Sequence, residues 1–492
     1  MPTHFQARNI FLAIAFSLPG FAFAQPSPET DSNLPADYLS KEFHAGRRAA
    51  LRQIMPDNSV MVMFAYPTRT FSNDVEYLYH ANPDMYYFSG YKEPHSLLLV
   101  FKDEQTDSSG KKYNEVLFVQ KRNAQAEQWT GKRLGTEGAT DRLGIGKSLN
   151  GNEFKNFKID FSKFSKIIYD KFPIDIPNGY DKADLFDLVD QFKQKSAMPE
   201  QLTQQNRFDT RLYMELTAQL REIKTPEELD LLRKAIEISC QGQNEVMKAV
   251  RPDMSELEIQ GLHEYVHKKH GAEGVGYGSI IGSGENGCIL HYMENTKTKV
   301  GGQLLLMDVG AEYHGYTADV TRTVPVDGKF SNEEKAIYQL VYDAQEAAFK
   351  TLKDGSRWAD AGAAAKNVIA EGLIKLGIIK NKSEVSKYFP HGLGHHIGLD
   401  VHDRGFYETL KKDMVITIEP GIYIPEGSKC DKKWWSIAVR IEDDLLITQN
   451  GYELLSHFAP RKIEDIEKLI SQKSVLDNYK LPPLESGKKK GF

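Results

Sequence analysis

Cysteine is scarce in this chain: Cys240, Cys288 and Cys430 are its three cysteines among 492 residues. So few thiols exclude a disulfide-dense secreted scaffold. An odd number also means that at least one thiol is free or paired with another molecule. We therefore expect a packed core, and not cross-links, to stabilise the fold.

Dense runs of positive charge are also missing from the body of the chain. Lys and Arg number 62 against 68 Asp and Glu, which gives a net charge of −6. Proteins that bind nucleic acid usually carry a basic patch, so no nucleic-acid partner is expected. Apolar residues make up 40% and charged residues 26%, as in ordinary soluble globular proteins, and the length allows two or three domains.

No apolar run in the chain is typical of a membrane-spanning helix. The apolar stretch 10–18 follows Arg8 and precedes Ala22-Phe23-Ala24, and it is shorter than the ~20 residues that span a bilayer. This pattern predicts a signal peptide, residues 1–24, cleaved before Gln25. The alternative is an N-terminal anchor, which the Pro19-Gly20 break disfavours, and no cysteine follows to carry a lipid. We expect an exported bacterial protein, periplasmic or secreted, without a stable membrane anchor.

The first half of the mature chain alternates short apolar runs with helical stretches. The patterns predict a helix at 41–55 and strands at 60–65, 86–91, 96–101 and 115–120. They indicate an α/β domain over residues 37–200, with a polar linker at 191–210.

A second domain, predicted over residues 211–470, has a clear helix start. Thr225 and Glu228 form a capping box, and Pro226 occupies the first helical position. Residues 471–492, which end in SGKKKGF, read as a C-terminal tail. The whole chain is therefore predicted to be α/β (α+β).

Two aspartates in LLLMDVGAEYHGYTADVTRT (304–323) indicate a cation site. The segment predicts strands at 304–307 and 320–324 around a tight turn at 313–315, which would place Asp308 directly opposite Asp319. Opposed side chains have Cβ atoms ~4.5–5.5 Å apart, where like charges repel. Apolar neighbours would bury both, and buried unpaired carboxylates are costly. A cation between them removes both costs, whereas two solvated aspartates on an exposed hairpin fit the apolar neighbours poorly.

An H-E-x-x-H sequence at 263–267 offers a competing metal site, because this pattern carries two zinc ligands and a general base in many metalloproteases. Ser255 and Glu258 predict a capped helix here, and Gly271 a suitable end. The simpler interpretation is an amphipathic helix with its apolar side on the core. No convincing third ligand follows, so we predict that this helix holds no zinc.

Three later segments carry further candidate ligands. Strand alternation in VITIEPGIYI (415–424) places Glu419 on one face with Thr417, and in AVRIEDDLLI (438–447) Arg440 shares a face with Glu442. Each charged face alone could be solvated. HGLGHHIGLDVHD (391–403) holds four histidines spaced by glycines. A generic histidine-rich metal tract is the alternative, but single histidines among apolar residues favour a catalytic site.

Taken together, these segments resemble aminopeptidase P, the X-Pro aminopeptidase of the pita-bread metallopeptidases. The resemblance covers nearly all of the mature chain and rests on ordered motifs, namely GSGENGCILHYMEN (282–295), 304–323, 391–403, TIEPGIYI (417–424) and VRIEDD (439–444). Three N-terminal segments also match: NDVEYLYH (73–80), 86–101 and AEQWTGKRLG (126–135). It implies an N-terminal creatinase-like α/β domain followed by a C-terminal pita-bread metallopeptidase domain.

The resemblance also implies a ligand set for two divalent metal ions. Asp308 would chelate one metal, His395 and Glu419 would hold the other, and Asp319 and Glu442 would bridge the two. Four carboxylates and one imidazole form a hard, oxygen-rich set that suits Mn²⁺. Two such ions ~3.5–4 Å apart can lower the pKa of a bound water to near neutrality.

Other residues would act on the substrate. By resemblance, His291, His391 and His402 would line the substrate site, and Tyr423 and Arg440 would support it. We expect His291 or His402 to donate hydrogen bonds to the tetrahedral intermediate.

Proton transfer and subunit contacts complete the implied site. Glu419 would shuttle the proton that the leaving proline nitrogen needs. Trp129 and Asp74 match positions that close a neighbouring subunit's site in oligomeric relatives, so a homo-oligomer, dimer or tetramer, is expected.

The resemblance implies hydrolysis of the X-Pro bond at the N-terminus of peptides, which releases the first amino acid. An X-Pro dipeptidase (prolidase) shares all five ligands and remains open. A methionine aminopeptidase fits the large N-terminal domain less well. A non-catalytic peptide-binding protein is a further alternative, which the complete ligand set disfavours.

Overall fold

The computed structural model describes residues 35–179, 183–201, 207–478 and 481–482. The predicted signal peptide and the end of the predicted tail lie outside the described residues. All elements below belong to the unit Leu39–Phe492. Within the described residues, none of the helices combines the length and apolar character that crossing a membrane requires.

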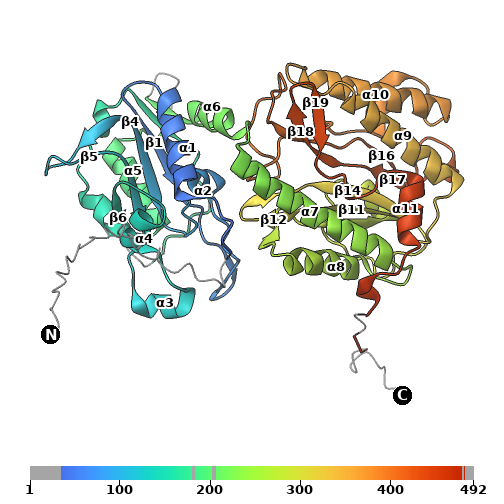
Figure 1. Cartoon of the computed structure of the whole chain (residues 1–492), viewed down its shortest axis with the longest axis horizontal. Helices are drawn as coiled ribbons and strands as arrows, with labels where there is room; N and C mark the ends of the chain where they lie inside the picture. The colour runs from blue at the N-terminus through green and yellow to red at the C-terminus, as the bar shows by residue number, and fades with distance from the viewer. Residues whose placement is uncertain (1–34, 180–182, 202–206, 479–480, 483–492) are drawn as a thin grey trace, which may run out of the picture. The chain divides into compact units, whose positions relative to one another are not determined.

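Both halves of the chain contain helices and strands (Figure 1). The N-terminal half contains α1 (Lys41–Ile54), β1 (Ser59–Phe64), β2 (Thr70–Ser72), β3 (Val75–Glu76), α2 (Pro83–Ser89), β4 (Leu97–Thr106), β5 (Lys112–Val119), α3 (Ala124–Thr130), α4 (Gly135–Asp141), β6 (Ser148–Asn150), β7 (Lys166–Tyr169), α5 (Leu185–Ser196), β8 (Phe208–Asp209) and α6 (Thr210–Arg221). The C-terminal half contains α7 (Pro226–Ala249), α8 (Glu256–Lys269), β9 (Gly274–Val275), β10 (Ile280–Ser283), β11 (Leu304–Val309), β12 (Ala311–Tyr313), β13 (Tyr316–Thr317), β14 (Val320–Pro325), α9 (Asn332–Phe349), α10 (Trp358–Lys375), β15 (Val415–Ile418), β16 (Gly421–Ile424), β17 (Ile437–Arg440), β18 (Asp443–Thr448), β19 (Gly451–Leu454) and α11 (Ile463–Ile470).

The N-terminal half is built on a mixed sheet with strand order β6-β5-β4-β1-β7-β8. Its central strand β1 pairs antiparallel with β4 and parallel with β7. All six residues of β1 are buried, because alternate side chains enter two cores. Met61 and Met63 pack with Leu51 of α1, whereas Val60 and Val62 pack with residues of α5. Helices on both faces confirm the predicted α/β domain, together with the predicted helix at 41–55.

One predicted strand in this half is wrong: residues 86–91 lie mainly in helix α2. The Asn82 side chain accepts hydrogen bonds from the backbone N–H groups of Asp84 and Met85, Pro83 opens the helix, and Gly90 ends it with a φ of 74°. Every residue of α2 is buried. A short apolar run buried on all sides has no polar face, so periodicity could not separate helix from strand.

Helix α5 also corrects the predicted linker. Residues 191–196 of that linker continue α5, whose first turn is capped by the Asp184 side chain. Leu188, Val189 and Phe192 are buried along one side of the helix. Since this apolar side packs into the N-terminal core, the polar residues between them lie on a helix surface and not in a linker.

The C-terminal half packs pairs of long helices against short sheets. Its sheets are β10-β11-β14, β13-β12-β9, β15-β18-β19 and β16-β17. Helices α7 and α8 (green in Figure 1) pack together, with α8 against β10 and α7 against β14. Helices α9 and α10 (orange) also pack together, and α9 contacts β16 and β17. The predicted capping box at Thr225 and Glu228 is present at the start of α7. Packing continues into the predicted tail, where Leu476 is buried.

The hairpin that carries the two aspartates has its turn where the sequence predicts one. His314 and Gly315 both have positive φ, 52° and 91°, as a two-residue hairpin turn requires. However, Asp308 pairs with Thr321, so the prediction that it lies directly opposite Asp319 is wrong by two residues. The turn is centred between His314 and Gly315, one position later than assumed. Side chains two residues apart share a face, so both aspartates still point the same way.

Candidate metal centre

A cavity of about 300 Å³ in the C-terminal half brings the predicted site residues together. Its wall includes all five predicted metal ligands, three predicted substrate-binding histidines and one arginine, namely Asp308, Asp319, His395, Glu419, Glu442, His291, His391, His402 and Arg440. Leu290, Met293 and Ile280 add an apolar part. Residues separated by 151 positions in the sequence thus converge on one cavity.

Strand ends position the ligands. Asp308 lies in β11, and Asp319 directly precedes β14. Glu419 directly follows β15, and Glu442 lies between β17 and β18. The histidine loop is held against β15, because the Thr417 N–H donates to the His395 carbonyl at 2.8 Å. A Cβ on Gly394 would lie 1.9 Å from the Thr417 carbonyl oxygen, so only glycine allows this close approach.

His395 presents one ring nitrogen to the carboxylates of the cavity. Its Nδ1 lies 3.0 Å from the backbone carbonyl of His396, to which it donates, and this leaves the Nε2 lone pair facing the carboxylates. Nε2 lies 3.4 Å from Asp319 Oδ2 and 3.9 Å from both Glu419 Oε1 and Glu442 Oε1. Nitrogen and oxygen ligands sit about 2.0–2.2 Å from a tetrahedral ion. Separations of this size between ligand atoms therefore suit donors around one ion.

Asp308 and Asp319 share a hydrogen-bond donor. The Tyr277 hydroxyl lies 2.5 Å from Asp308 Oδ1 and 2.6 Å from Asp319 Oδ1. Arg440 Nη2 binds the other Asp308 oxygen at 2.6 Å. Sequence reasoning missed Tyr277, because it lies in GVGYGS, where no charge or spacing marks it. It reaches the aspartates only through the pairing of β10 with β11.

Two further side chains hold the ligands from behind. The Thr321 hydroxyl donates to Glu442 Oε2 at 2.7 Å, and Asp444 Oδ2 accepts from the Asp319 N–H at 3.1 Å. Both partners are fully buried. Such contacts fix carboxylate orientation, and removing them in metal sites commonly costs ~10–100-fold in metal affinity.

Electrostatics at the site favour a bound cation. Burial raises the pKa of Glu419 to about 7 and that of Glu442 well above its usual range, and burial together with Asp308 raises the pKa of Asp319. Burial opposes ionisation of Asp308 as well, but Arg440 and Tyr277 hold its pKa below the ordinary value. Burial also opposes protonation of His395, yet the adjacent Asp319 raises its pKa to about 9. One arginine cannot neutralise four buried carboxylates, so the donor set fits divalent cations.

A second chain of hydrogen bonds links Arg440, Tyr423 and His391. Arg440 Nη1 donates to the Tyr423 hydroxyl at 2.9 Å, and that hydroxyl lies 2.9 Å from His391 Nε2. Burial lowers the pKa of His391 to about 4, so the ring is neutral and its Nε2 accepts from Tyr423. Nδ1 then donates to the Gly392 carbonyl, 2.8 Å away. Tyr423 itself does not line the cavity but orients a residue that does.

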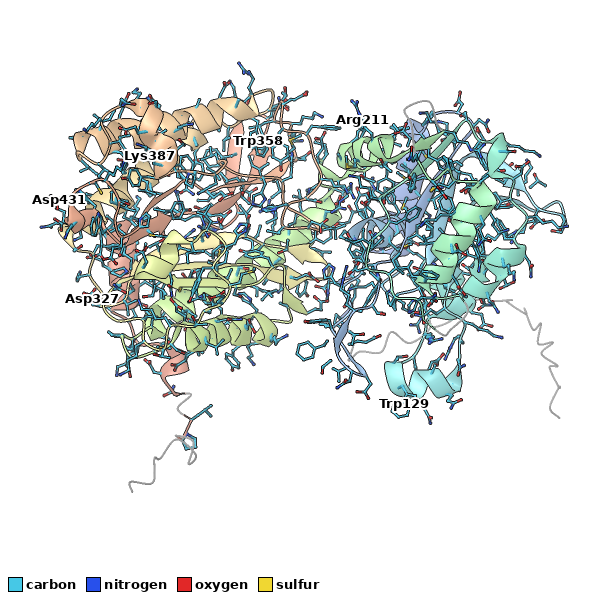
Figure 2. All side chains as sticks on the ribbon, turned by 180° about the vertical axis from the view of Figure 1, so that it is seen from behind. Trp129, Arg211, Asp327, Trp358, Lys387 and Asp431 are labelled. Carbon is cyan, nitrogen blue, oxygen red and sulfur yellow. The ribbon has the colours of Figure 1, made fainter. Side chains whose placement is uncertain are left out.

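The predicted site residues differ in their distance from this centre. His291 and His402 are exposed at the cavity wall, and the His402 ring packs edge-on against His395 with ring centres 4.4 Å apart. Trp129 on α3 is 86% exposed (Figure 2), and Asp74, between β2 and β3, is also exposed. Neither lines the cavity. Their assignment concerns a neighbouring subunit and stays a prediction.

The H-E-x-x-H helix lies behind the sheet, as its amphipathic pattern predicts. Consecutive residues of β11 face opposite sides: Asp308 lines the cavity, whereas Met307 Sδ lies 3.5 Å from His263 Nε2 on α8. Within the described residues, the cluster with metal-binding geometry is Asp319, His395 and Glu442. His263 and His267 are core histidines here, and not part of the metal centre.

These two histidines predict acid sensitivity of the fold. Burial lowers the pKa of His267 to about 4 and that of His263 well below its usual range. The unfolded chain takes up these protons first, so the free energy of unfolding should fall as pH drops from about 6.5 toward 4, by up to about 1.4 kcal/mol per pH unit for each histidine.

His263→Leu should therefore weaken the pH dependence of thermal unfolding between pH 7 and 5 and leave the metal content unchanged. Melting curves and elemental analysis test both parts. An unchanged pH dependence in this variant would contradict the histidine account, and loss of metal would restore the zinc-site interpretation.

The fold and this cavity define a metal-dependent hydrolase with a separate N-terminal domain. Comparison with known proteins agrees. Residues 230–449 match the model of metallopeptidase family M24, and residues 44–169 match that of the aminopeptidase P N-terminal domain.

Relatives match over most of their length. The chain is 34% identical to the Xaa-Pro aminopeptidase of Escherichia coli, over 87% of this chain and 97% of that protein. It is 30% identical to human Xaa-Pro aminopeptidase 3, over 93% of this chain and 92% of that protein. The structure of E. coli aminopeptidase P with the inhibitor Pro-Leu superposes with a TM-score of 0.77 at 33% identity, over 88% of this chain and 98% of that one. The chain belongs to the aminopeptidase P group of metallopeptidase family M24.

Proposed function

We propose that this chain is a metal-dependent X-Pro aminopeptidase, which hydrolyses the bond before a proline in second position and releases the first amino acid. The observation that carries the proposal is the convergence of the five ligands and three histidines on one cavity. Two sequence relatives quoted above are named Xaa-Pro aminopeptidases, which supports the same activity.

An inhibitor complex of a relative indicates where the proline side of the substrate would bind. E. coli aminopeptidase P has been solved with Pro-Leu as an inhibitor. Pro-Leu is what remains of an X-Pro-Leu peptide after its first residue is removed. An analogous peptide would place its proline ring here beside Leu290 and Met293, with His291 and His402 in the same wall as donors to the carbonyl oxygen.

The chain's own residues provide four parts of the reaction. When bound, the divalent ions would supply a nucleophilic water at neutral pH and polarise the scissile carbonyl. Asp308, Asp319, His395, Glu419 and Glu442 would hold the ions. Glu419 would pass a proton to the proline nitrogen, which carries no hydrogen of its own and must be protonated to leave. His291 or His402 would donate to the developing oxyanion, and Arg440 with Tyr423 would keep Asp308 and His391 in place.

We infer two Mn²⁺ ions as the cofactor, because the donor set is hard and oxygen-rich. Homo-oligomerisation, as a dimer or tetramer, would give the exposed Trp129 and Asp74 a neighbouring site to close.

Arg440 bears on the choice between aminopeptidase and dipeptidase. Among the described residues of the cavity wall it is the one Lys or Arg, and it already binds Asp308 and Tyr423. The free carboxylate of an X-Pro dipeptide would thus find no available cationic side chain. The longer peptide carries an amide at that position and needs none.

Substrate choice is therefore the test of this proposal. With Mn²⁺ supplied, we expect kcat/KM for Ala-Pro-Ala to exceed that for Ala-Pro by about tenfold or more, the worth of one charge-assisted hydrogen bond. Ala-Ala-Ala serves as the control without proline and should be cut poorly. Hydrolysis of the dipeptide alone would make the protein a prolidase, and hydrolysis of none would favour the peptide-binding alternative.

We propose that the protein is exported, from Arg8, the apolar stretch 10–18 and the Ala22-Phe23-Ala24 site. N-terminal sequencing of the protein from its native host should begin at Gln25. Protein that retains Met1 and fractionates with the cytoplasm would contradict export.

A further inference from the structure

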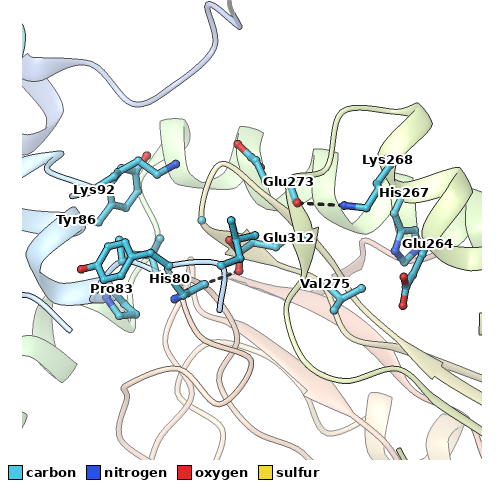
Figure 3. Close-up of a pocket in the computed structure, with 16 residues that line it drawn as sticks. His80, Pro83, Tyr86, Lys92, Glu264, His267, Lys268, Glu273, Val275 and Glu312 are labelled. Carbon is cyan, nitrogen blue, oxygen red and sulfur yellow. Dashed lines mark hydrogen bonds and ion pairs between the residues drawn. The ribbon is translucent and has the colours of Figure 1, made fainter. Parts of the chain in front are cut away.

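A second cavity, of about 480 Å³, shares no lining residue with the metal centre. The segment 78–92 forms one side, and α8, β9 and β12 form the other (Figure 3). Helix α8 packs on the face of the sheet that carries Met307, while Asp308 points to the opposite face. A ligand here would therefore lie behind the sheet, outside the reaction described above.

Two opposite charges on α8 are left unpaired at this cavity. Glu264 and Lys268 are four residues apart, with the acid first, which is the favourable order for a helical ion pair. Yet the structure records no ion pair for either residue within the part of the chain it describes. Glu264 instead accepts a hydrogen bond from Gln260 at 2.8 Å, and Lys268 donates weakly to the Glu273 carbonyl at 3.4 Å. Each charge is thus available to a ligand that carries both signs.

A buried polar side chain lies between these two charges. His267 is 1% exposed and lines the cavity beside Glu264 and Lys268 (Figure 3). Neither of its ring nitrogens has a hydrogen-bond partner among the described residues. Both nitrogens are themselves buried, and a Cβ on Gly242 of α7 would lie 3.0 Å from Nε2, so this edge of the ring faces α7. The ring therefore fills the wall behind Glu264 and Lys268 and leaves these two side chains as the charged groups that a ligand meets.

The rest of the wall selects against ligands of a single charge. The other charged side chains of the wall are already engaged: Glu312 pairs with His80 at 2.8 Å, Glu273 pairs with His314 at 2.6 Å, and Lys92 Nζ lies over the Tyr86 ring, 5.3 Å from its centre. Apolar side chains cover the space between, from Leu78, Pro83, Val275 and Leu399. The cavity thus combines one free negative charge, one free positive charge a helical turn away, and an apolar surface.

We propose that this cavity binds a free α-amino acid with an apolar side chain. Its ammonium group pairs with Glu264, its carboxylate pairs with Lys268, and its side chain lies on Leu78, Val275 and Leu399. The two charges of an α-amino acid are close together, which suits partners whose Cβ atoms are only ~5–6 Å apart on one helix face. The inference does not depend on the proposed peptidase activity.

Calorimetry with L-leucine on the full-length, Mn²⁺-supplied protein tests the proposal. We expect saturable binding that Glu264→Gln and Lys268→Met each weaken by about tenfold or more, as expected for a lost charge-assisted contact. N-acetyl-leucine and isopentylamine, which lack one charge each, should bind about tenfold more weakly or worse. Lys269→Met is the matched control, since this exposed neighbour does not line the cavity and should leave binding unchanged.

Asp319→Ala separates this cavity from the metal centre. Leucine binding should survive this change, because Asp319 lies on the other face of the sheet, even if the variant has no peptidase activity. Binding that disappears with Asp319→Ala, or that ignores Glu264→Gln and Lys268→Met, would overturn the proposal. So would the absence of any binding heat up to the solubility limit of leucine.

Discussion

Replacing Asp319 by alanine is expected to empty the metal centre and to lower X-Pro hydrolysis by about three orders of magnitude or more, since bound metals contribute several kcal/mol of transition-state stabilisation. Asp319 Oδ2 lies 3.4 Å from His395 Nε2, and Asp319 shares the Tyr277 hydroxyl with Asp308. Its carboxylate therefore lies between the two predicted ligands His395 and Asp308. Removing it also leaves His395 without the partner that raises its pKa. Elemental analysis of the folded variant, beside its kcat/KM on Ala-Pro-Ala, measures both effects.

Asp343→Ala is the matched control for this variant. Asp343 is an exposed carboxylate on α9 whose side chain binds only Gln339 among the hydrogen bonds described for it. Its loss should change neither metal content nor activity. Two tightly held metals per chain in Asp319→Ala would show that Asp319 does not bridge them.

His402→Ala is expected to lower kcat by about 10²–10³, the usual effect of removing one oxyanion donor. Its ring is exposed at the cavity and packs against His395 without being placed among the metal ligands. An interaction made only in the transition state lowers kcat and kcat/KM equally. Metal content should therefore stay at the wild-type value while both kinetic constants fall together.

His457→Ala provides the comparison, because His457 is an exposed histidine that bonds only to the Leu454 carbonyl in the structure. It should behave as wild type. If His402→Ala instead lost metal, His402 would act by holding His395, and the donor role would pass to His291. If it raised KM alone, His402 would contribute to substrate binding and not to the transition state.

Sequence patterns predicted the helices and strands in which apolar residues form short runs or recur at regular spacing. β1, β4 and β5 and the capped helices α1 and α7 lie close to their predicted positions. Helix α2 was predicted as a strand, because all its residues are buried and its aromatic run shows no polar face. The predicted strand partner of Asp308 was Asp319, whereas the observed partner is Thr321, two residues later. The sequence indicates that a turn is present, but it does not show which two residues form the centre of that turn.

The ligand residues could be proposed from sequence because each stands in an apolar strand or glycine-rich loop where a charge is costly. Their common cavity could not, because it depends on how four separate sheets pack. Tyr277 and Thr321 carry no charge and reach the carboxylates only across strands. The free charges of Glu264 and Lys268 were equally hidden, since their spacing on a helix usually indicates a simple ion pair.

Metal titration of the stripped protein tests the central claim most directly. The chain is proposed to release the first amino acid from X-Pro peptides by means of metals held at Asp308, Asp319, His395, Glu419 and Glu442. Chelated protein should be inactive on Ala-Pro-Ala, and stepwise Mn²⁺ should restore release of free alanine and Pro-Ala up to two equivalents per chain. Undiminished hydrolysis by protein shown to be metal-free, or cleavage that yields Ala-Pro and alanine from the other end, would contradict the account.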